Sequence, residues 1–338
     1  MSYPPSDRES GQLPGWLDRP FYQAFASHLA AACHRLRARV GGLAEPLASL
    51  ARPFVDGYGE ATWSHPYSFP LAFMPWWILD AAGRLPQTGV EFERAVDYAY
   101  GTMAGYLYIR IQDDIYDEPD RPSDARLLLV ANELICESLC AFGRHQTPEG
   151  RFWSCFRRYW EDFGQATLWQ MDAHRGRHTI PDESDLVRSG RRLSLAKAPC
   201  AAVLLDLGGT SRMEQMDQGM DLLQAANQLA NDVASVTRDI ESRNVTYPIA
   251  LATGPEFDWT AADYRESALR CVLRSEAVER ALERAADLHR RALAVMDGLA
   301  SPWLDAFVSA RIELLSCGAK EFTGLRLESL FGLMRPMD

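Results

Sequence analysis

The most informative segment of the chain is a polar cluster that ends a long helical pattern and reads Gln112-Asp113-Asp114-Ile115-Tyr116-Asp117-Glu118. Asp113 and Asp117 are four residues apart and share a helix face, whereas Asp114 lies about 100° around the helix. Neighbouring carboxylates repel one another, and negative charge at a helix C-terminus opposes the helix dipole. Because Mg2+ prefers oxygen ligands and bridges carboxylates to substrate phosphates, the cluster predicts a magnesium site. The alternative is an acidic helix end in solvent.

A second polar cluster follows about 118 residues later and reads Gln228-Leu229-Ala230-Asn231-Asp232-Val233-Ala234-Ser235-Val236-Thr237-Arg238-Asp239. Asn231, Ser235 and Asp239 are spaced by four residues, so an amide, a hydroxyl and a carboxylate share one face of the expected helix. These oxygens predict a second magnesium site. Arg238 beside them can donate charge-assisted hydrogen bonds to a phosphate. A polar stripe on an exposed helix explains each residue singly but not the pairing of the two clusters.

The rest of the chain is helical in pattern, because apolar residues recur at three- and four-residue spacing and sustained strand-like alternation is absent. Glycine and proline clusters separate the segments. We predict one all-α domain over residues 21–338, after an irregular, proline-rich arm over residues 1–20. The expected helices span 18–40, 69–83, 90–117, 123–145, 150–174, 182–207, 212–242, 261–297 and 302–331, with a short one after Pro248.

Charge and composition narrow the class of protein. The formal net charge is −11, which argues against nucleic acid as a partner because phosphate backbones are bound by basic surfaces. No stretch reaches the length of a membrane span. The seven cysteines are scattered and form no CxxC pair, so a reducing cytoplasm is the expected location.

The two clusters resemble motifs of the class I terpene synthases of bacterial type, which belong to the isoprenoid synthases. The first is similar to their aspartate-rich motif. The second is similar to their Asn-Asp-x-x-Ser-x-x-Lys-Glu motif, with Arg238 for lysine and Asp239 for glutamate. The resemblance covers about residues 60 to 320 and implies a helical bundle around a central active-site cavity, in a family where dimers are common. It also implies a prenyl diphosphate substrate and three Mg2+ ions, held by Asp113, Asp114, Asp117, Asn231, Ser235 and Asp239.

The family places one diphosphate-binding arginine before the second motif and another after it. Arg188 is the expected residue upstream, with Arg191 and Arg192 as rivals, and Arg311 is the expected residue downstream. The family usually has tyrosine after the second arginine, where this chain has Ile312. Together with Arg238 and Lys197, these arginines would hold the diphosphate as it leaves. Each also has the simpler interpretation of a surface residue.

The carbocation left by ionisation must be shielded from water and can be stabilised by aromatic faces. The candidates for this pocket are Phe73, Trp76, Trp77, Tyr106, Phe163 and Trp303. Ordinary core packing is the alternative for each of them.

Two other functions stay open on the sequence. The segments Ser194-Leu195-Ala196-Lys197-Ala198 and Asn244-Val245-Thr246-Tyr247-Pro248-Ile249 are similar to parts of the trans-prenyltransferases, and Gln228 to Asp239 also resembles the head-to-head synthases. Chain elongation requires a basic segment before the first motif, where this chain has Ser64-His65-Pro66-Tyr67-Ser68-Phe69-Pro70, and an arginine pair after it, where only Arg121 and Arg126 occur. Cyclisation is therefore favoured over prenyl transfer, and a non-catalytic isoprenoid-binding helical protein is the third hypothesis.

Overall fold

The computed structural model describes residues 19–65, 68–117, 125–174 and 179–333, and the side chains of 116–117, 173–174, 325 and 328–333 lie outside this description as well. Within these ranges the chain forms helices without a β-strand, which confirms the all-α prediction. None of the described helices is long and apolar enough to cross a membrane. The predicted arm lies almost wholly outside the described residues.

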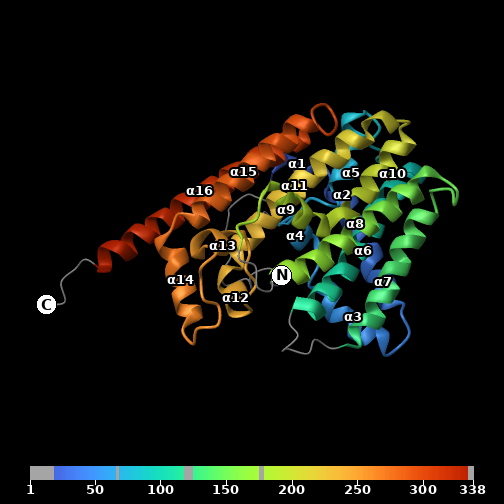
Figure 1. Ribbon diagram of the computed structural model, residues 1–338. Helices are drawn as coiled ribbons and strands as arrows, with labels where there is room; N and C mark the ends of the chain where they lie inside the picture. Colours follow the sequence, from blue (N-terminus) through green and yellow to red (C-terminus); the bar gives the residue numbers. More distant parts are fainter. Residues whose placement is uncertain (1–18, 66–67, 118–124, 175–178, 334–338) are drawn as a thin grey trace. The chain divides into compact units, whose positions relative to one another are not determined.

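The helices follow one another along the chain as labelled in Figure 1. They are α1 (Pro20–Gln23), α2 (Ala26–Gly41), α3 (Leu47–Asp56), α4 (Glu60–Trp63), α5 (Met74–Ala81), α6 (Gly89–Asp117), α7 (Leu127–Gly143), α8 (Arg151–His174), α9 (Glu183–Gly190), the 3-10 helix η1 (Arg191–Lys197), α10 (Ala198–Asp206), the 3-10 helix η2 (Thr210–Arg212), α11 (Met213–Ala234), α12 (Val236–Glu241), α13 (Tyr247–Thr253), α14 (Tyr264–Arg274), α15 (Ala277–Val295) and α16 (Trp303–Leu333).

The chain divides into two compact units. The first comprises Met1–Trp160, Leu195–Asp217 and Met296–Ala306, and the second comprises Glu161–Ser194, Gln218–Val295 and Phe307–Asp338. Four of the five boundaries fall inside α8, η1, α11 and α16, and the fifth falls at the end of α15. That residues 21–338 act as a single domain stays a prediction.

In the first unit, the long helix α6 packs against α2, α5, α7 and α10. Small residues allow the closest of these approaches, because a Cβ added to Gly101 of α6 would lie 2.9 Å from the Ala141 Cβ of α7. The sequence pattern predicted α6 because apolar residues recur along its whole length. This packing fixes the helix that carries the first motif.

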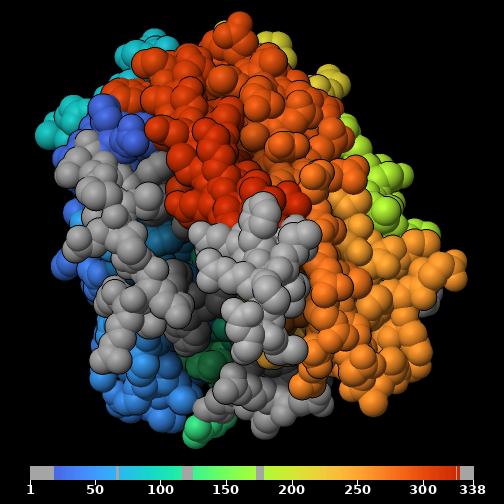
Figure 2. Space-filling view, turned by 90° about the vertical axis from the view of Figure 1, so that its left-hand side faces the viewer, coloured from blue at the N-terminus to red at the C-terminus, as the bar shows by residue number. Residues whose placement is uncertain are grey.

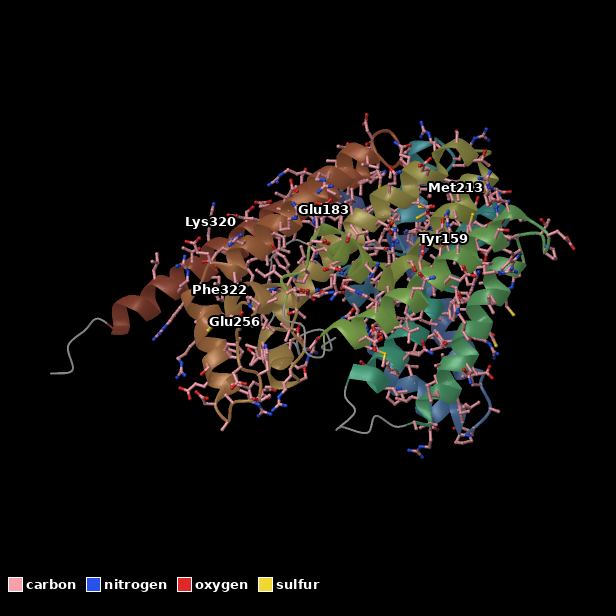
Figure 3. All side chains as sticks on the ribbon, in the orientation of Figure 1. Tyr159, Glu183, Met213, Glu256, Lys320 and Phe322 are labelled. Atoms are coloured by element: carbon pink, nitrogen blue, oxygen red, sulfur yellow. The ribbon has the colours of Figure 1, made fainter. Side chains whose placement is uncertain are left out.

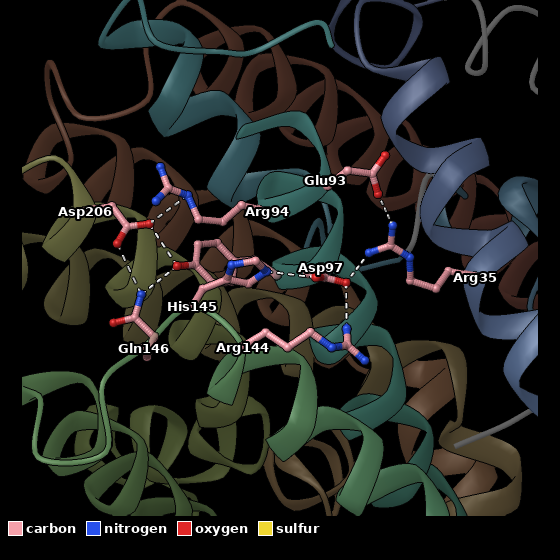
Figure 4. A network of polar contacts seen from close by, with 9 residues as sticks. Arg35, Glu93, Arg94, Asp97, Arg144, His145, Gln146 and Asp206 are labelled. Atoms are coloured by element: carbon pink, nitrogen blue, oxygen red, sulfur yellow. Dashed lines mark hydrogen bonds and ion pairs between the residues drawn. The ribbon is translucent and has the colours of Figure 1, made fainter. Parts of the chain in front are cut away.

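Polar contacts also fix the N-terminal half of α6 (Figure 4). The buried carboxylate of Asp97 accepts hydrogen bonds from Arg35 of α2 and from Arg144, whose Nη1 lies 2.9 Å away, and His145 Nε2 lies 2.8 Å from its second oxygen. Tyr98 donates to Asp206 of α10 at 2.8 Å. Because buried polar groups are costly when unpaired, these bonds set the position of α6 relative to α2, α7 and α10.

The second unit is built around an apolar core formed by residues of α9 and of α11 to α16. Its buried members include Leu186, Leu229, Ile240, Ile249, Leu288 and Leu315. Helix α9 begins with a capping box, in which the Asp182 side chain accepts from the Asp185 backbone and the Asp185 side chain accepts from the Asp182 backbone. The side chains of α15 (orange) and α16 (red) adjoin on the face shown in Figure 2. Between the same two helices, Thr323 and Arg326 donate to Glu279.

Candidate active site

The first motif lies in the last turns of α6, in the first unit. Asp113 is buried, with 3% of its surface exposed, whereas the Asp114 side chain is about one-third exposed. The side chain of Asp117 lies outside the described residues, so its role as a ligand stays a prediction. The structure therefore places one buried and one half-buried carboxylate at this end of α6.

A buried arginine that the sequence analysis did not include accompanies these carboxylates. Arg110 Nη2 lies 2.7 Å from Asp114 Oδ1, and its Nη1 lies 4.0 Å from Asp113 Oδ2. The signal was present in the sequence, because residues three and four apart meet on a helix. The repulsion expected within the first motif is thus partly offset by an internal counter-ion.

Tyr106, one of the predicted pocket residues, lies one turn before Arg110. It is therefore next to the first motif. Its ring contacts the Trp63 and Tyr58 rings edge-on, at centroid distances of 5.5 and 6.2 Å. Burial raises the pKa of the Tyr106 hydroxyl, which keeps it protonated. Arg110 Nε donates to Tyr58 Oη at 3.4 Å. An aromatic wall thus adjoins the acidic end of α6.

In the second unit, the predicted row of oxygen ligands is interrupted at Ser235, because α11 ends at Ala234 and α12 begins at Val236. The break still brings the side chains together: the Ser235 hydroxyl donates to Asp239 Oδ2 at 2.5 Å and lies 2.9 Å from the Asn231 carbonyl oxygen. Asn244 Nδ2 donates to Asp239 Oδ1 at 3.2 Å. Burial raises the pKa of Asp239, although Ser235, Arg238 and Asn244 oppose this shift.

Asp232, beside Asn231 in the motif, is a second buried carboxylate that the sequence analysis did not assign to the site. Gln228 Nε2 donates to its Oδ1 at 2.7 Å. Burial, together with the charge of Asp239, raises the pKa of Asp232 to about 7, and Arg192 acts in the opposite direction. Asp232 and Asp239 thus form a buried acidic pair, which a cation would stabilise.

The structure separates the three candidate arginines before the second motif. Arg188 is exposed and its guanidinium lies 5.2 Å over the Trp169 ring. Arg191 pairs with Asp221 at 3.0 Å. Arg192 is buried, and its charge opposes the rise in the pKa of Asp232. Arg192 therefore lies close enough to the second motif for its charge to influence Asp232.

The other two predicted arginines also lie in the second unit. Arg311 is 1% exposed, and its Nη2 donates to Asn227 Oδ1 at 2.9 Å. Because Asn227 precedes Asn231 by one helical turn, Arg311 lies beside the helix that carries the motif. Arg238 is half-buried, and its charge opposes the rise that burial causes in the pKa of Asp239.

Lys197 lies in the first unit, at the end of η1. It is 2% exposed, and its Nζ lies 5.6 Å from the centre of the Tyr159 ring, which is labelled in Figure 3. The Tyr159 hydroxyl donates to Asp217 at 2.6 Å. The structure thus shows a buried ammonium over an aromatic face, and its contact with diphosphate stays a prediction.

The remaining aromatic candidates lie in tightly packed surroundings. Phe73, Trp76 and Trp77 are fully buried in the first unit, where Trp76 Nε1 donates to the Ala95 carbonyl at 3.1 Å and Trp77 Nε1 donates to the Phe21 carbonyl at 3.3 Å. Trp303 Nε1 donates to Asp80 at 2.5 Å. Phe163 is buried in the second unit. These contacts fit core packing, and a pocket role for the five residues stays a prediction.

The donor atoms fit magnesium by their chemistry. The described residues contain no group of three or more His, Cys, Asp or Glu side chains placed to hold a metal ion. The Asn231, Ser235 and Asp239 set has only one such residue, since its other donors are an amide and a hydroxyl. Hard oxygen donors around a buried carboxylate are what Mg2+ binds, and they disfavour softer metals.

No protein-family model matches the sequence, and no curated protein matches it. Solved structures do resemble it. The chain is similar to a polyprenyl synthase from Roseobacter denitrificans, with a TM-score of 0.67 and 14% identity over 87% of this chain and 97% of that one. A geranylgeranyl pyrophosphate synthase from Lactobacillus brevis has a TM-score of 0.67 and 14% identity, over 89% and 98% of the two chains. A decaprenyl diphosphate synthase from Rhodobacter capsulatus has a TM-score of 0.64 and 16% identity, over 88% and 97%.

This likeness confirms the predicted fold, which is the all-α fold of the isoprenoid synthases. At such low identity the likeness concerns the fold alone, and function has to be argued from the residues of the site.

Proposed function

We propose that this protein is a magnesium-dependent enzyme that ionises a prenyl diphosphate and cyclises the resulting carbocation. The observation that carries the proposal is the second motif, where the Ser235 hydroxyl and the buried Asp239 carboxylate meet 2.5 Å apart, one turn from Asn231. The isoprenoid synthase fold supports the same class of substrate. In the first unit, the buried Asp113 is the proposed magnesium ligand of the first motif.

In the proposed reaction, the bond between the allylic carbon and the diphosphate oxygen breaks, and the electron pair leaves with the diphosphate. Bound Mg2+ would neutralise the negative charge of that leaving group. Arg192, Arg238 and Arg311 would donate hydrogen bonds to its oxygens. An alkene of the same molecule then attacks the cation, and loss of a proton or capture of water ends the reaction.

The sequence favours cyclisation because the segment expected to bind a second diphosphate has no lysine or arginine. A second isoprenoid diphosphate carries negative charge and needs its own basic residues. The segment from Ser64 to Pro70 offers no lysine or arginine. The buried Arg110 is already paired with Asp113 and Asp114. A reaction within one substrate molecule needs no second anion site.

Prenyl transfer to a second isoprenoid is the other candidate, and the comparisons support it better than they support cyclisation. The similar solved structures named above are all prenyl or polyprenyl synthases. The segments Ser194 to Ala198 and Asn244 to Ile249 also resemble trans-prenyltransferases. Transfer would form the new bond to a second molecule and leave a longer diphosphate.

Product analysis distinguishes the two reactions. Purified protein is incubated with geranyl, farnesyl, geranylgeranyl or geranylfarnesyl diphosphate, with magnesium or EDTA, and with or without isopentenyl diphosphate. A cyclic hydrocarbon or alcohol from one substrate alone supports cyclisation. A longer diphosphate that forms only with isopentenyl diphosphate supports prenyl transfer instead of cyclisation. If no substrate is consumed, the non-catalytic hypothesis replaces both.

A further inference from the structure

Asn227 connects the second motif to a buried arginine of another helix. It lies one turn before Asn231 on α11, so the two side chains share a helix face. Asn227 is 4% exposed, and its Oδ1 accepts a hydrogen bond of 2.9 Å from Nη2 of Arg311 on α16. Both residues belong to the second unit.

The other neighbours of Arg311 include an aromatic ring and a neutral imidazole. The guanidinium carbon lies 5.8 Å from the centre of the Phe307 ring, one turn earlier on α16. Burial, and next the charge of Arg311, lower the pKa of His289 on α15 to about 3. The neutral His289 ring is held by its Nδ1, which donates to the Ala285 carbonyl at 2.8 Å.

The amide of Asn227 can fix the guanidinium without neutralising it. An aspartate has nearly the same size and would also accept the hydrogen bond, but it would form a buried ion pair with Arg311. An anionic ligand would then have to compete with that carboxylate for the guanidinium. An amide therefore suits an arginine whose charge acts on a ligand, whereas a purely structural contact would tolerate the carboxylate.

We propose that Asn227 is a positioning residue that holds the Arg311 guanidinium beside the helix face carrying Asn231, where it donates to the diphosphate of the substrate. This inference rests on the proposed function, because it assumes that Arg311 meets a diphosphate. It assigns to Asn227 a role that neither motif contains.

The test compares three variants of the full chain. Asn227→Asp keeps the shape and the acceptor but places an added carboxylate against Arg311. Asn227→Ala removes the acceptor. Gln218→Glu is the matched control, because it adds one negative charge at an exposed position of the same helix. For each protein we would measure the thermal unfolding midpoint, the Kd of inorganic diphosphate in saturating magnesium by calorimetry, and kcat and KM separately.

We expect Asn227→Asp to unfold at the wild-type temperature or above it, and to bind inorganic diphosphate about tenfold more weakly or worse. Asn227→Ala should lose affinity and kcat, and Gln218→Glu should behave as wild type. If folded Asn227→Asp binds diphosphate with wild-type affinity, the role of Asn227 is overturned but the proposed function is not. If the wild-type protein binds no diphosphate in magnesium, the proposed function fails, and the inference fails with it.

Discussion

At the scale of single residues, Arg110 and its two aspartates combine charge with burial. Arg110 is 3% exposed and pairs with Asp114 at 2.7 Å. Breaking a buried ion pair typically costs about 3–5 kcal/mol, because the remaining charge is left uncompensated. We expect Arg110→Met to lower the free energy of unfolding of metal-free protein by about 3 kcal/mol. Added Mg2+ should restore more stability to this variant than it adds to wild type.

Chemical denaturation with and without Mg2+ measures both effects. The control is Arg52→Met, whose ion pair with Glu45 is exposed on both sides and should contribute less than about 1 kcal/mol. The charge argument is wrong if Arg110→Met is as stable as Arg52→Met. It is also wrong if Mg2+ stabilises Arg110→Met no more than wild type.

The same geometry distinguishes the two aspartates. Asp113 is buried and lies 4.0 Å from Arg110, whereas the Asp114 side chain is about one-third exposed and pairs with Arg110 at 2.7 Å. We expect Asp113→Asn to reduce kcat/KM by roughly 100-fold or more, as loss of a charge-stabilising group commonly does, and to raise the magnesium concentration that the enzyme requires. Asp114→Asn should have the smaller effect. Steady-state kinetics across a magnesium series would show this, and equal losses in the two variants would contradict it.

The four-residue spacing of the second motif agrees with a contact in the structure, and the role of these residues as magnesium ligands stays a prediction. Steps of four residues correctly place Ser235 and Asp239 together, even though α11 ends between Asn231 and Ser235 in the structure. Spacing could not choose among Arg188, Arg191 and Arg192, because η1 changes the rotation per residue at that point. The role of Arg110 as a counter-ion follows from spacing alone, because Arg110 precedes Asp113 and Asp114 by three and four residues on the same helix.

At the scale of elements, α9 approaches α11 closely just before the chain reaches the buried Arg192. A Cβ added to Gly190 of α9 would lie 2.5 Å from the backbone nitrogen of Ala225 on α11. Backbone atoms cannot yield as side chains do, so α9 would have to move away from α11. We expect Gly190→Ala to lower the free energy of unfolding by about 1–3 kcal/mol and to weaken diphosphate binding through Arg192.

Gly164→Ala on α8 is the matched control, because a Cβ at Gly164 meets nothing within 4 Å. It should leave stability unchanged or raise it by about 0.5–1 kcal/mol, since alanine favours the helix. Urea unfolding of the two variants measures the difference. Equal stability of Gly190→Ala and Gly164→Ala would show that the close approach of α9 and α11 does not require glycine at position 190.

The helix boundaries show what periodicity can predict. The long patterns over 90–117 and 150–174 correspond closely to α6 and α8, because glycine and proline mark their ends. The helices α3 and α4 were missed. Helix α3 contains Pro53, which lacks a backbone donor, and α4 has only four residues, too few for a pattern. The pattern over 182–207 was predicted as one helix, but η1 divides it.

At the scale of the whole molecule, His289 makes stability depend on pH. Burial lowers its pKa to about 3, compared with the ordinary value of 6.5. Below pH 6.5 the unfolded chain therefore binds a proton that the folded protein does not, and stability falls as the pH decreases toward 3. Between pH 7 and pH 5 this single group should cost about 2 kcal/mol.

His289→Gln removes the titrating group while its amide can still donate to the Ala285 carbonyl. The free energy of unfolding of this variant should fall less than that of wild type between pH 7 and pH 5, by about 2 kcal/mol. Carboxylates contribute equally to both proteins and cancel in the comparison. Parallel pH curves for the two proteins would show that His289 is protonated in the fold.

The all-α class could be predicted for the whole chain from the apolar spacing, and the fold comparisons confirm the isoprenoid synthase architecture. Sequence spacing does not predict the division into two compact units, because that division depends on contacts among residues far apart along the chain. Substrate length and oligomeric state likewise depend on three-dimensional contacts, which residue spacing does not encode.

The most direct test of magnesium-dependent ionisation is the release of inorganic diphosphate from a single allylic prenyl diphosphate. Wild-type protein and the Asn231→Ala/Ser235→Ala double variant would each be assayed with geranyl, farnesyl, geranylgeranyl and geranylfarnesyl diphosphate, in Mg2+ or EDTA. We expect release by wild type in Mg2+ from at least one substrate, none in EDTA, and none by the folded double variant. Release that persists in EDTA or in the double variant would contradict the metal-assisted mechanism, and absence of release from every substrate would contradict the proposed function.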